Sequence, residues 1–118
     1  MKTILIVDDE ARLADLMAAQ LEDEGYEVLL AHDGRMALEM MQATDADLVI
    51  TDFMMPRMTG LELARAIRSQ ERYAAVPIIL VSGANGSVGR EHPDLFNAVL
   101  DRPHPPGRLI EQVEAVLA

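Results

Sequence analysis

Short aliphatic runs alternate with longer segments of helical periodicity along this chain of 118 residues, and no other feature limits its fold as strongly. Strands that alternate with helices form βα units, whose right-handed crossovers produce a parallel sheet. The first run, Ile4-Leu5-Ile6-Val7, is apolar at every position, as expected for a central strand that is covered on both faces. The pattern predicts a single α/β domain over residues 1–118 with five parallel strands.

The boundaries of these elements follow from apolar periodicity and capping residues. Strands are expected at 3–7, 27–31, 48–51 (ending in Asp52), 77–82 and 98–101, and helices at 11–24, 34–42, 60–70 and from 105 to the end. Gly25, Asp33 and Thr59 are placed to cap the first three helices. The predicted buried stripe of the first helix comprises Leu13, Leu16, Met17, Gln20 and Leu21.

Residues 83–97, where a fourth helix belongs, contain helix breakers. Gly86, Gly89 and Pro93 all oppose helix formation there. We therefore expect a short or irregular fourth helix.

Composition narrows the range of functions. The chain has no cysteine, which excludes disulfides and thiolate metal sites, and it has neither a leader-like segment nor a long apolar run. Its formal charge of −10 argues against broad contact with nucleic acid or anionic lipid, which require a basic surface. We expect a cytoplasmic protein that binds neither nucleic acid nor membrane through this chain.

Polar side chains follow three of the predicted strands. Asp8-Asp9-Glu10 follow the first, Asp52 ends the third and Ser82 ends the fourth. The carboxyl ends of parallel strands form the ligand crevice of such folds, so neighbouring first and third strands would bring Asp8, Asp9 and Asp52 together. Carboxylates that lie close together either bind a hard divalent cation or raise the pKa of one of their own number. Singly, Asp8 or Asp9 could cap the next helix and Asp52 could lie in a surface turn; jointly they favour a metal site.

The sequence resembles the receiver domains of bacterial response regulators over its whole length. The resemblance rests on residues 4–10, on Ala31-His32-Asp33-Gly34 leading to Ala37-Leu38, on 48–60 with its Asp-x-Met-Met-Pro-x-Met-x-Gly segment, on 77–83 and on Arg102-Pro103. It implies a flavodoxin-like, doubly wound sheet in the order 2-1-3-4-5 with five helices.

The resemblance also implies roles for individual residues. Asp52 would be the phosphoacceptor, and Asp9 and Asp52 would bind Mg²⁺ directly. Met54 would add its backbone carbonyl to the ion, and Asp8 would reach it through water. Ser82 matches the switch hydroxyl that bonds the new phosphoryl oxygen; its alternative is a hydroxyl that caps the loop after its strand.

Three positions depart from the family pattern. Arg102 stands where the family usually has Lys, and a planar guanidinium fork does not replace a compact ammonium. It could contact a phosphate oxygen, or bridge Asp52 bidentately and hold the site shut. Val99 replaces the aromatic switch residue, and His104 stands where Phe is common and is expected in a solvated loop.

The main hypothesis is a phosphorelay module that receives a phosphoryl group on Asp52 from a sensor histidine kinase or a histidine phosphotransfer protein. It would then switch a contact with a downstream protein, and a homodimer is left open. The alternative is a degenerate receiver, altered at Arg102 and Val99, that binds partners independently of phosphorylation. An enzyme with an aspartyl intermediate lacks a lid segment, and a flavin module lacks a phosphate cradle, so no small-molecule turnover is expected.

Overall fold

One parallel sheet organises the computed structural model, which describes residues 1–118. The strand order is β2-β1-β3-β4-β5, as the resemblance to receiver domains implied, with β1 in the interior of the sheet. The strands are β1 (Thr3–Val7), β2 (Glu27–Ala31), β3 (Leu48–Asp52), β4 (Ile78–Ser82) and β5 (Ala98–Asp101).

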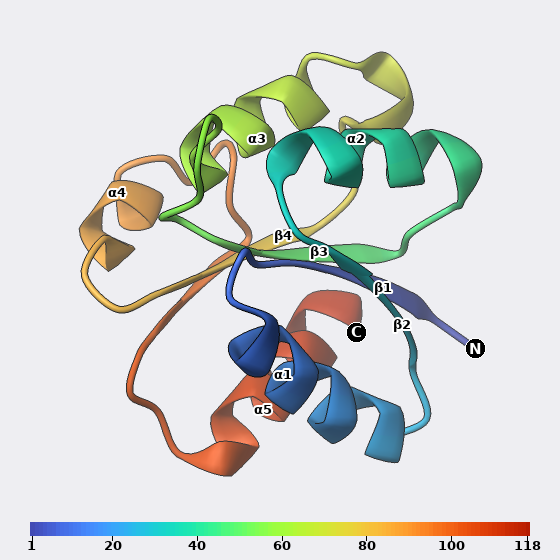
Figure 1. The fold of residues 1–118 in the computed structure, drawn as a ribbon, viewed down its shortest axis with the longest axis vertical. Helices are drawn as coiled ribbons and strands as arrows, with labels where there is room; N and C mark the ends of the chain where they lie inside the picture. Colours follow the sequence, from blue (N-terminus) through green and yellow to red (C-terminus); the bar gives the residue numbers. More distant parts are fainter.

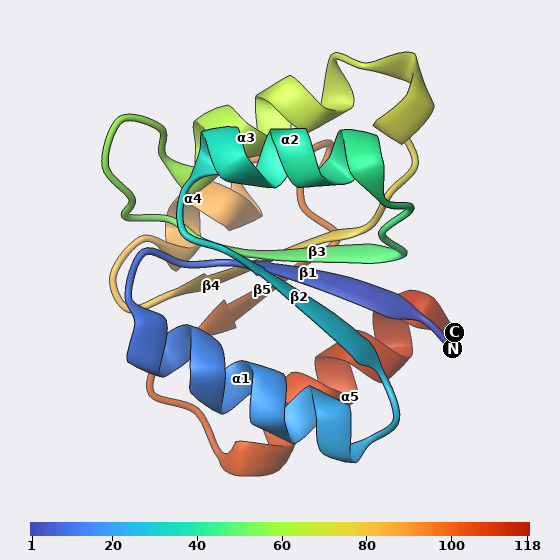
Figure 2. The same cartoon turned by 45° about the vertical axis from the view of Figure 1, so that its right-hand side comes forward.

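Helices cover both faces of the sheet (Figure 1). They are α1 (Ala11–Asp23), α2 (Gly34–Ala43), α3 (Gly60–Arg68), α4 (Gly86–Arg90) and α5 (Pro106–Leu117), with a single 3₁₀ turn, η1 (Glu71–Tyr73), after α3. Figure 2 shows α1 and α5 below the sheet and α2, α3 and α4 above it. None of these helices is long and apolar enough to cross a membrane.

The sheet separates two hydrophobic layers. Successive strand residues point to opposite faces, so Leu5 and Val7 join a cluster of 15 buried residues on the α2 and α3 side. Ile4 and Ile6 join a cluster of 13 on the α1 and α5 side. This double burial explains why β1 is apolar at consecutive positions.

The predicted caps are present at three helices. The Asp33 carboxylate accepts the Met36 N–H at 2.8 Å. Thr59 forms a capping box with Glu62, because its hydroxyl accepts the Glu62 N–H while the Glu62 carboxylate accepts the Thr59 N–H. Gly25 follows α1 with a φ of 93°, a conformation that glycine adopts without strain.

The predicted stripe of α1 is wrong at Leu16, whose side chain is 62% exposed. Leu13 and Gln20 are half-buried. The buried face is centred instead on Ala14, Met17, Ala18 and Leu21, which share one side of a helix with 3.6 residues per turn. The two alanines let the helix approach the sheet closely, a contribution that a search for large apolar residues overlooks.

Other predicted boundaries differ by one or two residues. α1 ends at Asp23, α2 runs to Ala43, α3 ends at Arg68 and β4 begins at Ile78. The early end of α3 has a physical reason, because the Arg68 side chain bonds carbonyl groups of the following turn.

The fourth helix is short, as predicted. α4 has five residues and packs against the sheet through glycine. A Cβ atom on Gly89 would lie 2.7 Å from Val99 Cγ2 and 2.8 Å from Leu80 Cδ2, so this helix approaches the strands as only glycine allows. Arg90 of α4 also forms an ion pair with Asp101 of β5.

Candidate acidic site at the sheet edge

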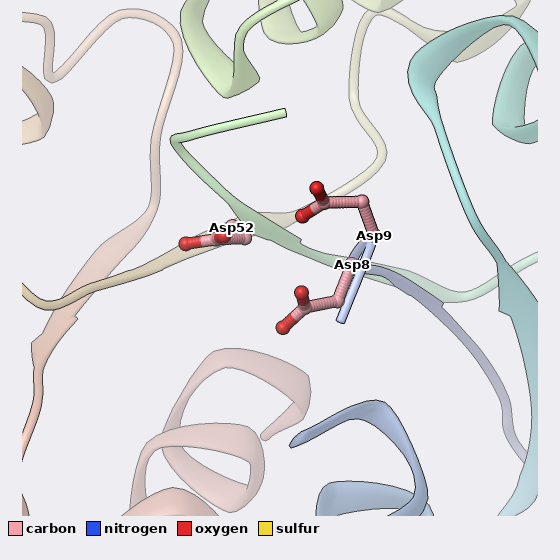
Figure 3. A group of neighbouring side chains, drawn as sticks. All are labelled: Asp8, Asp9 and Asp52. Atoms are coloured by element: carbon pink, nitrogen blue, oxygen red, sulfur yellow. The ribbon is translucent and has the colours of Figure 1, made fainter. Parts of the chain in front are cut away.

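The three carboxylates predicted to converge do so at the carboxyl edge of the sheet. β1 and β3 are neighbours with Val7 paired to Thr51, and this register places Asp8 beside Asp52. One oxygen from each of Asp8, Asp9 and Asp52 lies within 4.8 Å of the others. Figure 3 shows Asp8 and Asp9 leaving the end of β1 in different directions and Asp52 coming from the neighbouring strand.

The three carboxylates differ in burial. Asp8 is fully buried, the Asp52 side chain is 14% exposed and Asp9 is exposed. Asp8 Oδ1 accepts the Glu10 N–H at 2.9 Å, which holds the turn into α1. The N-terminus of α1 itself has no side-chain cap, so neither Asp8 nor Asp9 caps this helix. The site thus combines one enclosed, one intermediate and one solvent-facing carboxylate.

Asp52 is electrostatically unfavourable as an anion. Burial raises its pKa above the ordinary value of 3.8, and the negative charges of Asp8 and Asp9 raise it further. Arg102 and the Phe53 N–H act in the opposite direction without cancelling the rise. A positive charge placed beside Asp52 would relieve this cost.

Arg102 reaches this cluster from the loop after β5. Its Nη2 donates to Asp8 Oδ2 at 3.2 Å, and its Nη1 lies 3.6 Å from Asp52 Oδ1. The sequence suggested that both terminal nitrogens of Arg102 could bind Asp52, and this is wrong. One nitrogen contacts Asp8 and the other lies near Asp52. Its backbone N–H donates to the Ser82 carbonyl at 2.8 Å, which fixes the start of the loop against β4.

The Ser82 side chain is buried at the end of β4 and holds the following loop. Its Oγ accepts the Asn85 N–H at 2.8 Å and the Ala84 N–H at 3.3 Å. This is the loop-capping geometry that the sequence offered as an alternative to the switch role. Ser82 Oγ accepts these two bonds but donates none to another group of the protein, so its O–H is free to donate.

Gly60, to which the sequence analysis gave no role in the site, positions the backbone of Asp52. A Cβ at Gly60 would clash with the Asp52 carbonyl oxygen and lie 3.1 Å from Phe53 Cα. The Gly60 N–H also donates to the Phe53 carbonyl at 2.9 Å, closing the loop that carries the exposed Met54. The Asp-x-Met-Met-Pro-x-Met-x-Gly spacing contained this signal, but sequence alone does not show the contact.

Val99 and His104 lie beside the site without joining the acidic cluster. Val99 is half-buried on β5 and faces Gly89 of α4. His104 is also half-buried, rather than fully solvated as expected, and its Nδ1 lies 3.1 Å from the Pro105 carbonyl oxygen. It lines a surface hollow of about 400 Å³ together with Leu13, Leu16, Met17, Gln20, Arg102 and Pro103.

This fold and acidic edge match a family of signalling domains. The family model of the response regulator receiver domain matches residues 4–113 of the sequence, and the chain belongs to that family. It is therefore a signalling module of the class that accepts a phosphoryl group in two-component systems.

Individual relatives agree with this assignment. The chain is 35% identical to the phosphate regulon transcriptional regulatory protein PhoB of Pseudomonas aeruginosa, over 98% of this chain and 52% of PhoB. It thus spans about half the length of that curated relative. The structure of the chemotaxis protein CheY4 of Vibrio cholerae is 34% identical, with a TM-score of 0.91 over 99% of each chain. The Thermotoga maritima response regulator TrrA, solved with Mg²⁺-BeF, is 34% identical with a TM-score of 0.86, over 99% of this chain and 100% of TrrA.

Proposed function

We propose that Asp52 is the phosphoacceptor and that Asp9 and Asp52 bind Mg²⁺ directly, with Asp8 reaching the ion through water and Met54 adding its backbone carbonyl. The observation that carries this proposal is the convergence of three carboxylate oxygens within 4.8 Å at the edge of the sheet. Three anionic oxygen donors suit a hard cation. The relative TrrA, which was solved with Mg²⁺-BeF, supports the same choice of ion.

The chemistry at Asp52 is transfer of a phosphoryl group from a phosphohistidine. An Asp52 carboxylate oxygen forms a bond to phosphorus while the phosphorus–nitrogen bond breaks, and the departing imidazole keeps the electron pair. A bound divalent ion would neutralise charge on the phosphoryl oxygens during this transfer. The Ser82 hydroxyl, which is free to donate, would bond one of those oxygens afterwards.

Partners and output follow from this role. A sensor histidine kinase or a histidine phosphotransfer protein would be the donor, and the readout would be an altered contact with a downstream protein in the cytoplasm. The phosphoryl group adds about −1.5 to −2 charges, enough to bias a loop between two arrangements. We expect no turnover of small molecules.

Phosphorylation by a small donor tests this proposal. The protein is incubated with acetyl phosphate and Mg²⁺, and its intact mass is measured. We expect one added phosphoryl group, loss of the adduct in Asp52→Asn and in EDTA, and a slower reaction in Asp9→Asn. Asp45→Asn, at an exposed position away from the site, is the matched control and should react as the natural sequence does. An adduct that persists in Asp52→Asn would show that Asp52 is not the acceptor.

A further inference from the structure

We propose that the Arg102 guanidinium is the resident counter-ion of the acidic site, and that a divalent ion enters only when this side chain swings away toward Gln20. The inference rests on the metal site proposed above. It assigns to Arg102 a competition with the metal for the same carboxylates.

The first observation is that Arg102 contacts both Asp8 and Asp52. Its two terminal nitrogens lie 3.2 Å from Asp8 Oδ2 and 3.6 Å from Asp52 Oδ1, so one cation serves two of the three carboxylates. No other basic side chain forms an ion pair with this cluster, and Asp8 is fully buried. A buried carboxylate without a partner is costly, so the guanidinium has a strong reason to stay.

The second observation concerns the geometry of the fork. A guanidinium is planar and carries separate donor groups, so it can span two acids at once, whereas an ammonium acts as a point charge. A metal that takes an Asp52 oxygen removes one end of this bridge and places like charges side by side. Binding of the metal and seating of Arg102 therefore oppose each other.

The third observation shows where the displaced side chain can go. Arg102 borders the hollow lined by α1 residues, and its Nη2 already lies 4.0 Å from Met17 Sδ. Gln20 lies one turn further along the same face of α1 and lines the same hollow. Its Oε1 is the one buried side-chain oxygen or nitrogen of the protein that has no hydrogen-bond partner. A guanidinium that moves into the hollow would supply that missing donor.

Metal affinity measures the competition directly. Mg²⁺ and Mn²⁺ binding is measured by titration calorimetry for the natural sequence, for R102K and for R102M. We expect R102M to bind about tenfold more tightly, within the usual range for coupled sites, and R102K to lie between the two. R108M is the control, because Arg108 is an exposed arginine on α5 that pairs only with Glu111, and it should change the affinity little.

The natural sequence provides a readout that does not depend on any variant folding. The side-chain N–H resonances of Arg102 are followed by nuclear magnetic resonance during a Mg²⁺ titration. We expect them to shift together with the resonances of the Gln20 side-chain amide. Unchanged Arg102 side-chain resonances at saturating metal would overturn the proposal.

Gln20 tests the second position of the arginine. Q20L should weaken metal binding a few-fold in the natural sequence, because it removes the oxygen that receives Arg102, whereas Q20E should strengthen it. In the R102M background Q20L should have no effect, a result that a merely structural role for Gln20 would not give. Q70L, at a half-buried glutamine in the turn between α3 and η1, is the control.

The outcomes separate this inference from the proposed function. Equal metal affinity in the natural sequence, R102K and R102M would overturn the competition while leaving the metal site in place. Absence of binding in all three proteins would overturn the metal site and the inference with it. Tighter binding in R102M, with an unchanged R108M, would support both.

Discussion

At the scale of single residues, two arginines of this domain bond carboxylate or carbonyl oxygens that lie far away in sequence. Arg102 and Asp8 are 94 positions apart, and Arg68 and Leu95 are 27 apart. The sequence could identify Asp8, Asp9 and Asp52 because strand ends are recognisable. The sequence could not show that Arg102 contacts both Asp8 and Asp52. That contact depends on how the ends of β1 and β3 are positioned relative to each other and on the turn after β5.

Asp52→Asn is expected to stabilise the metal-free protein at neutral pH. The raised pKa means that the folded state holds a proton on Asp52 more readily than the unfolded state does, so stability falls as pH rises from about 3.8 through the folded pKa. Removing the charge should raise the free energy of unfolding, because the variant no longer buries an anion beside Asp8 and Asp9. Urea unfolding in EDTA measures it.

This gain should shrink as the pH approaches 3.8, where the carboxylate becomes protonated in both states. Asp45→Asn, at an exposed ion pair, should show almost no change at either pH. Lower stability of Asp52→Asn at neutral pH would contradict the electrostatic picture of the site.

Arg68 is expected to be a strong stabilising residue outside the site. Its guanidinium donates to the carbonyls of Tyr73, Val76 and Leu95, and burial lowers its pKa. Arg68→Ala would remove the side-chain donor from these carbonyls, of which only that of Tyr73 keeps a backbone donor, the Val76 N–H, and should cost about 2–3 kcal/mol of unfolding free energy. Arg65→Ala, one turn earlier and exposed, should cost far less; equal losses would show that the carbonyl contacts contribute little.

At the scale of elements, the caps and the breakers were the most predictable features. Asp33 and Thr59 act locally, within three residues, and therefore appear in sequence. The face of α1 was less predictable, because Ala14 and Ala18 gain burial from the closeness of the sheet rather than from their own size. The shortness of the fourth helix was predictable from its glycines, but the reason for them, close packing on β4 and β5, was not.

Gly89→Ala should therefore destabilise the domain although alanine is the better helix former. The new methyl group would meet Val99 and Leu80, and we expect a loss of about 1–3 kcal/mol from overpacking. Ser87→Ala, on the exposed side of the same helix, should be neutral or stabilising by about 0.5 kcal/mol. Thermal unfolding of the two variants compares them. A stabilised Gly89→Ala would mean that α4 does not pack this closely.

At the scale of the whole molecule, the family resemblance implied the strand order, and the strand order in turn placed the site. Parallel strands bring their carboxyl ends to one edge, so a correct order almost determines which side chains meet there. The net charge is also a property of the whole: the chain has 20 acidic and 10 basic residues, which gives −10. Such an excess opposes compaction through self-repulsion.

Added salt should consequently stabilise this protein. Raising NaCl from about 10 mM to about 1 M shortens the Debye length from roughly 30 Å to 3 Å and screens repulsion between exposed acids. We expect the melting temperature in EDTA to rise by about 5 °C, which corresponds to roughly 1 kcal/mol for a domain of this size. The melting temperature is followed by circular dichroism, and a fall with salt would show that attractive pairs outweigh the repulsion.

The two hydrophobic layers on opposite faces of the sheet have an energetic consequence of their own. Met41 belongs to one layer and Met17 to the other, with the sheet between them. Substitutions at such positions share no neighbours, so their effects on unfolding should simply add, and a double-mutant cycle between them should close near zero. Each face of this domain can then change its packing without disturbing the packing of the other.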